Sequence, residues 1–253
     1  MEGVCAYGCG ALIGTVVGLP DHSAGQIGEA LALANQLKHG PTLVHALGCA
    51  AELHYLRREP QKTEHYASLL LPLVEKHGSP VVLSNAMMLR GWAKVMQGDR
   101  QGGIAIMHEG IAAWRATGSR FRETYRLALA AEAHLVCKEM EAGLQLVPAA
   151  TNESADRWLA PEGHRIRGEL YLAQHHAELA QECFQAALAL ARAQEARLLE
   201  LRAAASLVRL WHDQRKRDEA RELLAPVYEW FTEGFDTRDL KEAKALLDEV
   251  AAR

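Results

Sequence analysis

Aromatic residues are scarce in this chain of 253 residues: they make up 6% of it, whereas 49% of the residues are hydrophobic. Isolated segments rich in Val, Thr and Ile and bounded by hairpin turns are also hard to find, which argues against a β-sheet fold. Alanine and leucine are frequent instead, and this composition favours close-packed helices. We therefore expect an all-α protein with essentially no sheet.

An excess of positive charge is absent too. The formal net charge is −4, so no global basic field attracts nucleic acid or an anionic membrane. One basic run, at residues 215–217, is flanked by acidic residues and is typical of a solvated turn between helices. The sequence therefore predicts no nucleic-acid partner and no membrane association.

No segment has the character of a membrane span or a signal peptide. The stretch from Val4 to Leu19 is moderately apolar, but it is too short and too poor in leucine for a span and lacks a basic start. The chain has 5 cysteines, an odd number, and most lie within expected helices, so nothing resembles a disulfide framework. We expect a cytoplasmic protein.

The chain does contain a motif that recurs about six times, at a spacing of about forty residues. Each copy is predicted to be two amphipathic helices joined by a short polar turn. A small residue is expected near the start of the second helix, at Ala24, Thr63, Gly103, Gly143, Ala180 and Ala220. Another is expected on the first helix, at Leu12, Ala51, Gly91, Ala131, Gly168 and Val208, of which the first and last match poorly. Small residues allow two helices to cross closely, and the pattern is that of tetratricopeptide repeats, whose strict unit has about 34 residues.

The repeats predict one domain over residues 1–253: a tetratricopeptide-like, right-handed α-α superhelix of about six helix pairs. The expected repeats span residues 4–39, 40–78, 79–118, 119–152, 153–195 and 196–235, and a capping helix follows at 238–252. The second helix of the fourth repeat is expected to be short, and residues 151–156 to form a loop. The first helix, within residues 1–18, is apolar on all sides: it is a weak cap, or it continues from an upstream segment, or another molecule covers it.

Three stretches of the chain resemble a known family. They are Arg90-Gly91-Trp92-Ala93 continuing through Gly98-Asp99 and Gly103-Ile104 to residues 110–118, the segment 200–211, and the tail Leu224-Ala225-Pro226-Val227-Tyr228-Glu229-Trp230-Phe231 continuing to Thr237. Together they are similar to the C-terminal tetratricopeptide region of large bacterial signalling proteins. Those proteins also carry an adenylate/guanylate cyclase-type domain and a predicted ATPase domain of the signal-transduction type. The resemblance covers about residues 19–253.

The resemblance implies the role of the repeat part: a sensor or protein-docking arm that regulates ATPase or cyclase domains, which are therefore expected partners. The chain has no Gly-x-x-x-x-Gly-Lys-Ser/Thr loop and no cyclase-like segment, so the family's catalytic activities fall on no residue here. We expect a non-catalytic protein without a cofactor. Two interpretations stay open: a domain cut from a longer protein, and a free-standing descendant.

Candidate binding residues follow from the register of the repeats. In tetratricopeptide folds the first helix of each pair lines the concave face, and the residue after its small crossing position points toward that groove. These residues are Glu52, Trp92, Glu132, Glu169 and Arg209. A second set, six positions before the crossing residue, is His45, Asn85, Tyr125, Glu162 and Arg202. Acidic, aromatic and basic positions of this kind suit an extended peptide or a helix. The competing interpretation is that several of them pair with neighbouring repeats or stay solvated.

Residues that could bind a metal are a weaker signal. Cys5 and Cys9 share a helix face, but no paired Cys/His motif follows, so we favour an apolar pair, buried or at an interface, and predict no metal. His175 and His176 point in different directions on a helix and lie at an expected turn. Two alternatives to a binding scaffold stay open: a homodimer formed through the apolar first helix, and an α-helical hydrolase that uses a metal or a cysteine.

Overall fold

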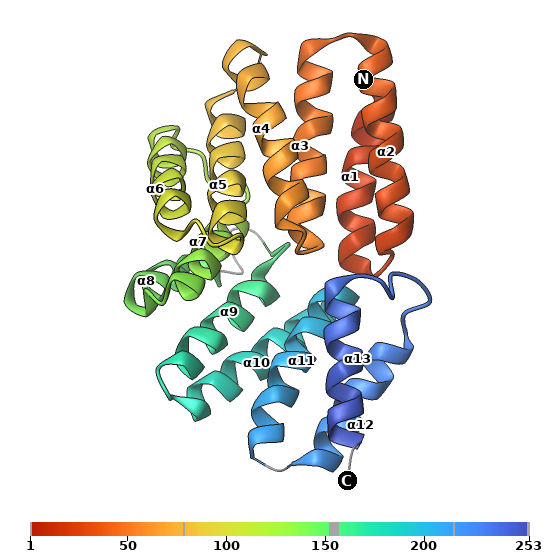
Figure 1. The fold of residues 1–253 in the computed structure, drawn as a ribbon, viewed down its shortest axis with the longest axis vertical. Helices are drawn as coiled ribbons and strands as arrows, with labels where there is room; N and C mark the ends of the chain where they lie inside the picture. Colours follow the sequence, from red (N-terminus) through yellow and green to blue (C-terminus); the bar gives the residue numbers. More distant parts are fainter. Residues whose placement is uncertain (1, 78, 152–156, 215, 252–253) are drawn as a thin grey trace. The chain divides into compact units, whose positions relative to one another are not determined.

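The computed structural model describes residues 2–77, 79–151, 157–214 and 216–251. All regular structure in these ranges is helical, and the elements run from α1 to α13 (Figure 1). The expectation of an all-α fold is therefore confirmed for the part of the chain that the structure describes. In the same part, no helix combines the length and the hydropathy that crossing a bilayer requires.

The helices form consecutive pairs, and each expected repeat contains one pair. The pairs are α1 (Glu2–Val17) with α2 (Pro20–Leu37), α3 (Gly40–Leu56) with α4 (Pro60–His77), α5 (Pro80–Met96) with α6 (Arg100–Ala116), α7 (Glu123–Cys137) with α8 (Met140–Ala150), α9 (Ala160–Ala173) with α10 (Ala177–Ala193), and α11 (Arg197–Asp213) with α12 (Arg217–Glu229). The last helix, α13 (Arg238–Ala251), stands where the capping helix is expected. As expected, α8 is short. Of the predicted loop at 151–156, residues 152–156 lie outside the described residues.

The chain groups into two compact units. Unit 1 comprises residues 1–15 and 20–121, and unit 2 comprises residues 16–19 and 122–253. The expectation of one domain over the whole chain stays a prediction.

Small residues lie where the two helices of a pair cross, as the repeat alignment predicts. A Cβ atom on Gly103 would lie 2.6 Å from the carbonyl oxygen of Gly91, and a Cβ atom on Gly91 would lie 2.7 Å from that of Gly103. Real Cβ atoms do not approach so closely, so only glycine lets α5 and α6 pack at this distance. In the second repeat the corresponding Ala51 and Thr63 are fully buried.

The turn inside a pair has the same backbone geometry in several repeats. A residue one or two positions after the end of the first helix has positive φ: Arg58 (56°), Gly98 (100°), Lys138 (64°) and His175 (64°). The next amide then donates to a carbonyl five residues back, in the bonds Glu59 to His54, Asp99 to Lys94, Glu139 to His134 and His176 to Tyr171. This is the Schellman motif, which satisfies carbonyl groups at the end of a helix. His175 and His176 are therefore exposed turn residues, as the sequence predicts.

In unit 2 the first helices of successive pairs contact one another: α7 contacts α9, α9 contacts α11, and α11 contacts α13. Among the described residues, the second helices α8, α10 and α12 contact only members of that first set. In a curved stack, the helices of the inner layer contact one another, whereas the helices of the outer layer do not. The contacts therefore assign α7, α9, α11 and α13 to the inner layer. We call α7, α9, α11 and α13 the inner helices of unit 2. In unit 1, α3 and α5 contact each other in the same way.

Candidate binding surface on the inner helices

A strip of ion pairs crosses the inner helices of unit 2. Its members are Glu132 on α7, Glu162, Arg165 and Glu169 on α9, Arg202 and Arg209 on α11, and Asp239 and Glu242 on α13. We call this set the ionic strip. The structure thus brings together all the charged residues that the register predicts for this half of the chain.

Arg165 is the centre of the strip. Its Nε and Nη2 atoms donate to the two carboxylate oxygens of Glu162 at 3.0 and 2.7 Å, a bidentate pair. Its Nη1 atom donates to Oε1 of Glu169 at 3.3 Å, and its Nη2 atom lies 3.9 Å from Oε1 of Glu132. Spacings of three and four residues place Glu162, Arg165 and Glu169 on one face of α9.

Arg202 continues the strip toward the capping helix. Its Nη1 atom donates to Oε1 of Glu162 at 3.5 Å, and its Nη2 atom donates to Oδ2 of Asp239 at 2.8 Å. All three residues are buried. Buried charges are tolerated when they are paired, and here Arg165 and Arg202 together balance the two carboxylates of Glu162 and Asp239.

The charge state of the buried part is fixed by these contacts. Burial raises the pKa of the Glu162 carboxyl, but the guanidinium groups of Arg165 and Arg202 outweigh it and hold that pKa below its usual value. Burial lowers the pKa of Arg202, while Asp239 and Glu162 outweigh it and raise that pKa. Glu162 and Arg202 are therefore both charged at neutral pH, and the pattern of charge is permanent there.

The strip becomes accessible at its edges. The side chains of Arg209 and Glu242 pair at 3.2 Å and are 42% and 30% exposed. Arg238 also donates to Glu242, at 2.7 Å. Glu169 is partly exposed and accepts a hydrogen bond from the hydroxyl of Ser206 at 2.7 Å. Arg209, Glu242 and Glu169 are therefore the members that a partner can reach.

In unit 1 the predicted polar residues make a smaller contact. Nδ2 of Asn85 on α5 donates to Oε1 of Glu52 on α3 at 2.8 Å, and both side chains are buried. His45 is half-buried on α3 and lies apart from this pair, with its Nε2 atom 3.7 Å from Sγ of Cys49. The polar residues of unit 1 are thus divided between two places.

The two predicted aromatic residues are buried rather than displayed on a groove. Trp92 is 2% exposed and packs edge-on against Tyr55, with ring centroids 4.9 Å apart. Tyr125 is 1% exposed; its ring lies 5.9 Å from that of Trp158, and the guanidinium group of Arg122 stacks on both rings. A partner could not touch Trp92 or Tyr125 without displacing neighbouring side chains. We therefore correct their role from ligand contact to helix packing.

Register alone did not find three members of the strip: Arg165, Asp239 and Glu242. A signal for Arg165 was present, because it lies three residues after Glu162 and four before Glu169, on the same helix face. Asp239 follows Arg202 by 37 residues, close to the repeat length, on a helix expected only to cap the stack.

Comparison with models of known protein families finds no match, and none is found among curated proteins. Solved structures do match. The apo form of RapI is similar with a TM-score of 0.59 and 9% identity, over 98% of this chain and 70% of that chain. NprR in complex with its cognate peptide NprX is similar with a TM-score of 0.62 and 11% identity, over 92% of this chain and 66% of that chain. At these identities the likeness shows the fold, and the chain is a tetratricopeptide-like stack of helix pairs.

Proposed function

We propose that the chain is a non-catalytic scaffold that binds a peptide or an extended protein segment along its inner helices. The observation that carries the proposal is the accessible edge of the ionic strip, where Glu169, Arg209 and Glu242 present acidic and basic groups on three neighbouring helices. Groups that are already in position bind a partner without a further ordering cost.

Stability alone does not account for the strip. Buried ion pairs contribute about as much to folding as well-packed hydrophobic residues of similar volume, or less. The charges of Glu162, Arg202 and Asp239 therefore need another reason to lie in the middle of the inner layer. A paired buried network holds packed helices in one arrangement, and here it links α9, α11 and α13, which carry the accessible charges of Glu169, Arg209 and Glu242. Complementary charge at that accessible edge confers specificity and a fast encounter with a charged partner.

The accessible edges indicate the chemistry of the ligand. Arg209 can donate hydrogen bonds to a carboxylate, from an acidic side chain or a chain terminus, while Glu169 and Glu242 can accept hydrogen bonds from donor groups of the same ligand. A peptide with both charge signs fits this arrangement. The solved complex of NprR holds its cognate peptide, and a ligand of the same class on this similar fold supports the proposal.

The wider role is part of the same proposal. The chain acts as a sensor or regulatory module in a bacterial signal-transduction system in the cytoplasm, and its protein partners are nucleotide-dependent ATPase or cyclase domains. The resemblance of residues 19–253 to the repeat region of such proteins supports this role.

A random peptide library selected on the immobilised chain tests the proposal. We expect enriched peptides that carry an acidic residue or a free C-terminal carboxylate. Arg209→Ala should then weaken binding at least about tenfold, as loss of a charged interface contact does. Arg221→Ala is the matched control, since Arg221 is an exposed arginine on the outer helix α12, and it should bind as the parent chain does. An unenriched library, or equal losses in the two variants, contradicts the proposal.

A second candidate function is self-association through α1. Tyr7 and Ile13 are 40% and 58% exposed on this helix, whose only charged residue is Glu2. A second copy of the chain would remove this apolar surface from water. Light scattering over a rising concentration series measures the mass directly, and a mass that stays at one chain excludes the homodimer.

A further inference from the structure

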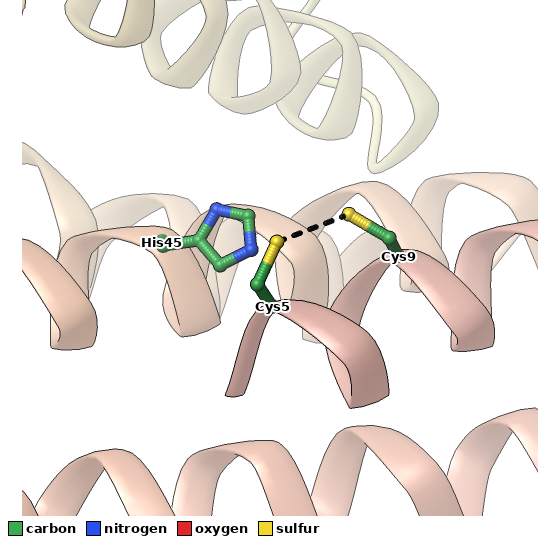
Figure 2. A group of neighbouring side chains, drawn as sticks. All are labelled: Cys5, Cys9 and His45. Carbon is green, nitrogen blue, oxygen red and sulfur yellow. Dashed lines mark hydrogen bonds between the residues drawn. The ribbon is translucent and has the colours of Figure 1, made fainter. Parts of the chain in front are cut away.

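In unit 1 the fold brings together two thiols and an imidazole that lie far apart in the sequence. Cys5 and Cys9 lie one turn apart on α1, with their Sγ atoms 3.9 Å apart. His45 comes from α3, and the ligand atoms of the three residues all lie within 4.8 Å of one another. Figure 2 shows both thiols and the imidazole ring on the same side of α1, close together. We propose that Cys5, Cys9 and His45 bind one zinc ion.

The spacing fits a tetrahedral zinc site. Bonds of about 2.3 Å to sulfur and about 2.1 Å to nitrogen place two ligand sulfurs about 3.8 Å apart, and a sulfur and a nitrogen about 3.6 Å apart. The two Sγ atoms of Cys5 and Cys9 are already at this separation. The Nε2 or Nδ1 atom of His45 has to close a gap of no more than about 1.2 Å, given its 4.8 Å limit. A change of side-chain torsion supplies that movement.

Packing between α1 and α3 explains why the three groups meet. A Cβ atom on Gly8 would lie 2.9 Å from Sγ of Cys49 and 3.6 Å from Nε2 of His45. Gly8 therefore lets α1 approach α3 at this point. Cys5 lies three residues before Gly8 and Cys9 directly follows it, so the close approach at Gly8 also brings both thiols near His45.

The donor set selects a soft, thiophilic cation. All five cysteines are in the thiol form, and thiolate with imidazole is a ligand combination that proteins use for zinc. Cys5 and Cys9 are exposed while His45 is half-buried, so the site is open to solvent on the α1 side. Three protein ligands with an open position describe a zinc site that keeps a water molecule as its fourth ligand. Cys49 places a third thiol beside the site, with its Sγ atom 3.7 Å from Nε2 of His45.

The site lies in unit 1 and shares no residue with the ionic strip of unit 2. It is therefore independent of the proposed peptide binding, and either proposal stands if the other fails. The proposal also changes the interpretation of Cys5 and Cys9 on the first helix. Instead of forming an apolar pair, the two exposed thiols bind a metal ion.

Cobalt titration of the reduced, metal-free chain tests the site. We expect one Co²⁺ per chain, with a thiolate-to-cobalt charge-transfer band and the visible bands of tetrahedral cobalt, and we expect Zn²⁺ to abolish both. Competition against a chromogenic chelator then gives the zinc affinity. A reduced chain that develops no charge-transfer band overturns the proposal, and one metal per two chains overturns it in favour of an interface between copies.

Variants identify the ligands. Cys5→Ser, Cys9→Ser and His45→Ala should each weaken zinc binding by about 100-fold or more, beyond the roughly 10–100-fold loss typical of outer-shell partners. Cys137→Ser removes a partly exposed thiol of unit 2 and should leave the affinity unchanged. Cys49→Ser should keep the cobalt spectrum, because water is the fourth ligand of the proposed site. Circular dichroism should show full helicity in all of them, and zinc binding that survives the double variant Cys5→Ser/Cys9→Ser contradicts the assignment.

Discussion

The Nη2 atom of Arg202 on α11 donates to Oδ2 of Asp239 on α13 at 2.8 Å, and both side chains are buried. The contact joins the last helix to the preceding pair by charge, in addition to the packing of Leu240 and Ala243 against the core of that pair. Because Arg202 also reaches Glu162, the network runs from α13 through α11 to α9. The capping helix is therefore part of the candidate binding surface as well as its end.

Removal of Arg202 should strongly destabilise the chain. Arg202→Leu leaves Glu162 and Asp239 buried near each other without this positive partner, and breaking a buried pair typically costs about 3–5 kcal/mol. Urea unfolding followed by circular dichroism measures the loss. Arg209→Leu, on the same helix but exposed, should cost no more than about 1 kcal/mol. Equal losses of unfolding free energy in the two variants would mean that the buried ion pairs contribute no more to stability than the exposed pair.

The Glu59 carboxylate should make stability depend on pH. Burial raises the pKa of Glu59, but hydrogen bonds from His54 and Arg57, at 2.6 and 3.1 Å, outweigh it and lower the pKa from 4.5 to about 2. A lowered folded-state pKa stabilises the fold above the unfolded value and loses that effect as the pH falls from 4.5 toward 2.

Glu59→Gln should therefore be less stable than the parent chain at pH 7, and the difference should shrink steadily below about pH 4.5. Thermal unfolding at pH 7 and at pH 3 measures it. Glu75→Gln changes an exposed carboxylate on α4 and should shift stability by no more than about 0.5 kcal/mol at either pH. A difference for Glu59→Gln that grows with acid would contradict the assigned contacts.

The close crossing of α5 and α6 should not tolerate a methyl group. Gly103→Ala places a Cβ atom 2.6 Å from the carbonyl oxygen of Gly91, so the helices must separate, at a cost of about 1–3 kcal/mol. Gly28→Ala on α2 is the control, because its Cβ atom meets nothing within 4 Å and alanine is the better helix former by up to about 1 kcal/mol. Chemical denaturation should thus show opposite signs for the same substitution, and a neutral Gly103→Ala would remove the packing explanation of the repeat.

The prediction of one domain has its own test in calorimetry. If residues 1–253 unfold as one cooperative domain, a single transition should appear whose calorimetric enthalpy equals its van't Hoff enthalpy. Two transitions would instead assign independent stability to unit 1 and unit 2. The variants Gly103→Ala and Arg202→Leu, one in each unit, identify which transition moves.

Much of the fold is predictable from the sequence because it depends on spacing. Gly91 and Gly103 determine where two helices cross, because a larger residue does not fit there. Gly98 lies between them and determines where the first helix ends, because it has positive φ. These are local requirements that recur about every forty residues, so a register found in one repeat transfers to the others. The helix pairs and the last helix follow directly from that register.

The candidate sites are less predictable, because register gives the direction of a side chain but not its depth. It placed Glu162 and Arg202 on the inner face, yet it could not show that Trp92 and Tyr125 are covered by neighbouring rings. Ligand sets assembled between helices are harder still. The cluster of Cys5, Cys9 and His45 depends on the approach of α1 to α3 at Gly8, and no motif along the chain encodes that approach.

Hydrogen exchange on the chain saturated with a selected peptide tests the central claim most directly. Binding along the inner layer predicts slower amide exchange in α9, α11 and α13, with α10 and α12 unchanged. Protection confined to α10 and α12, or no protection in any of these helices, would contradict the account.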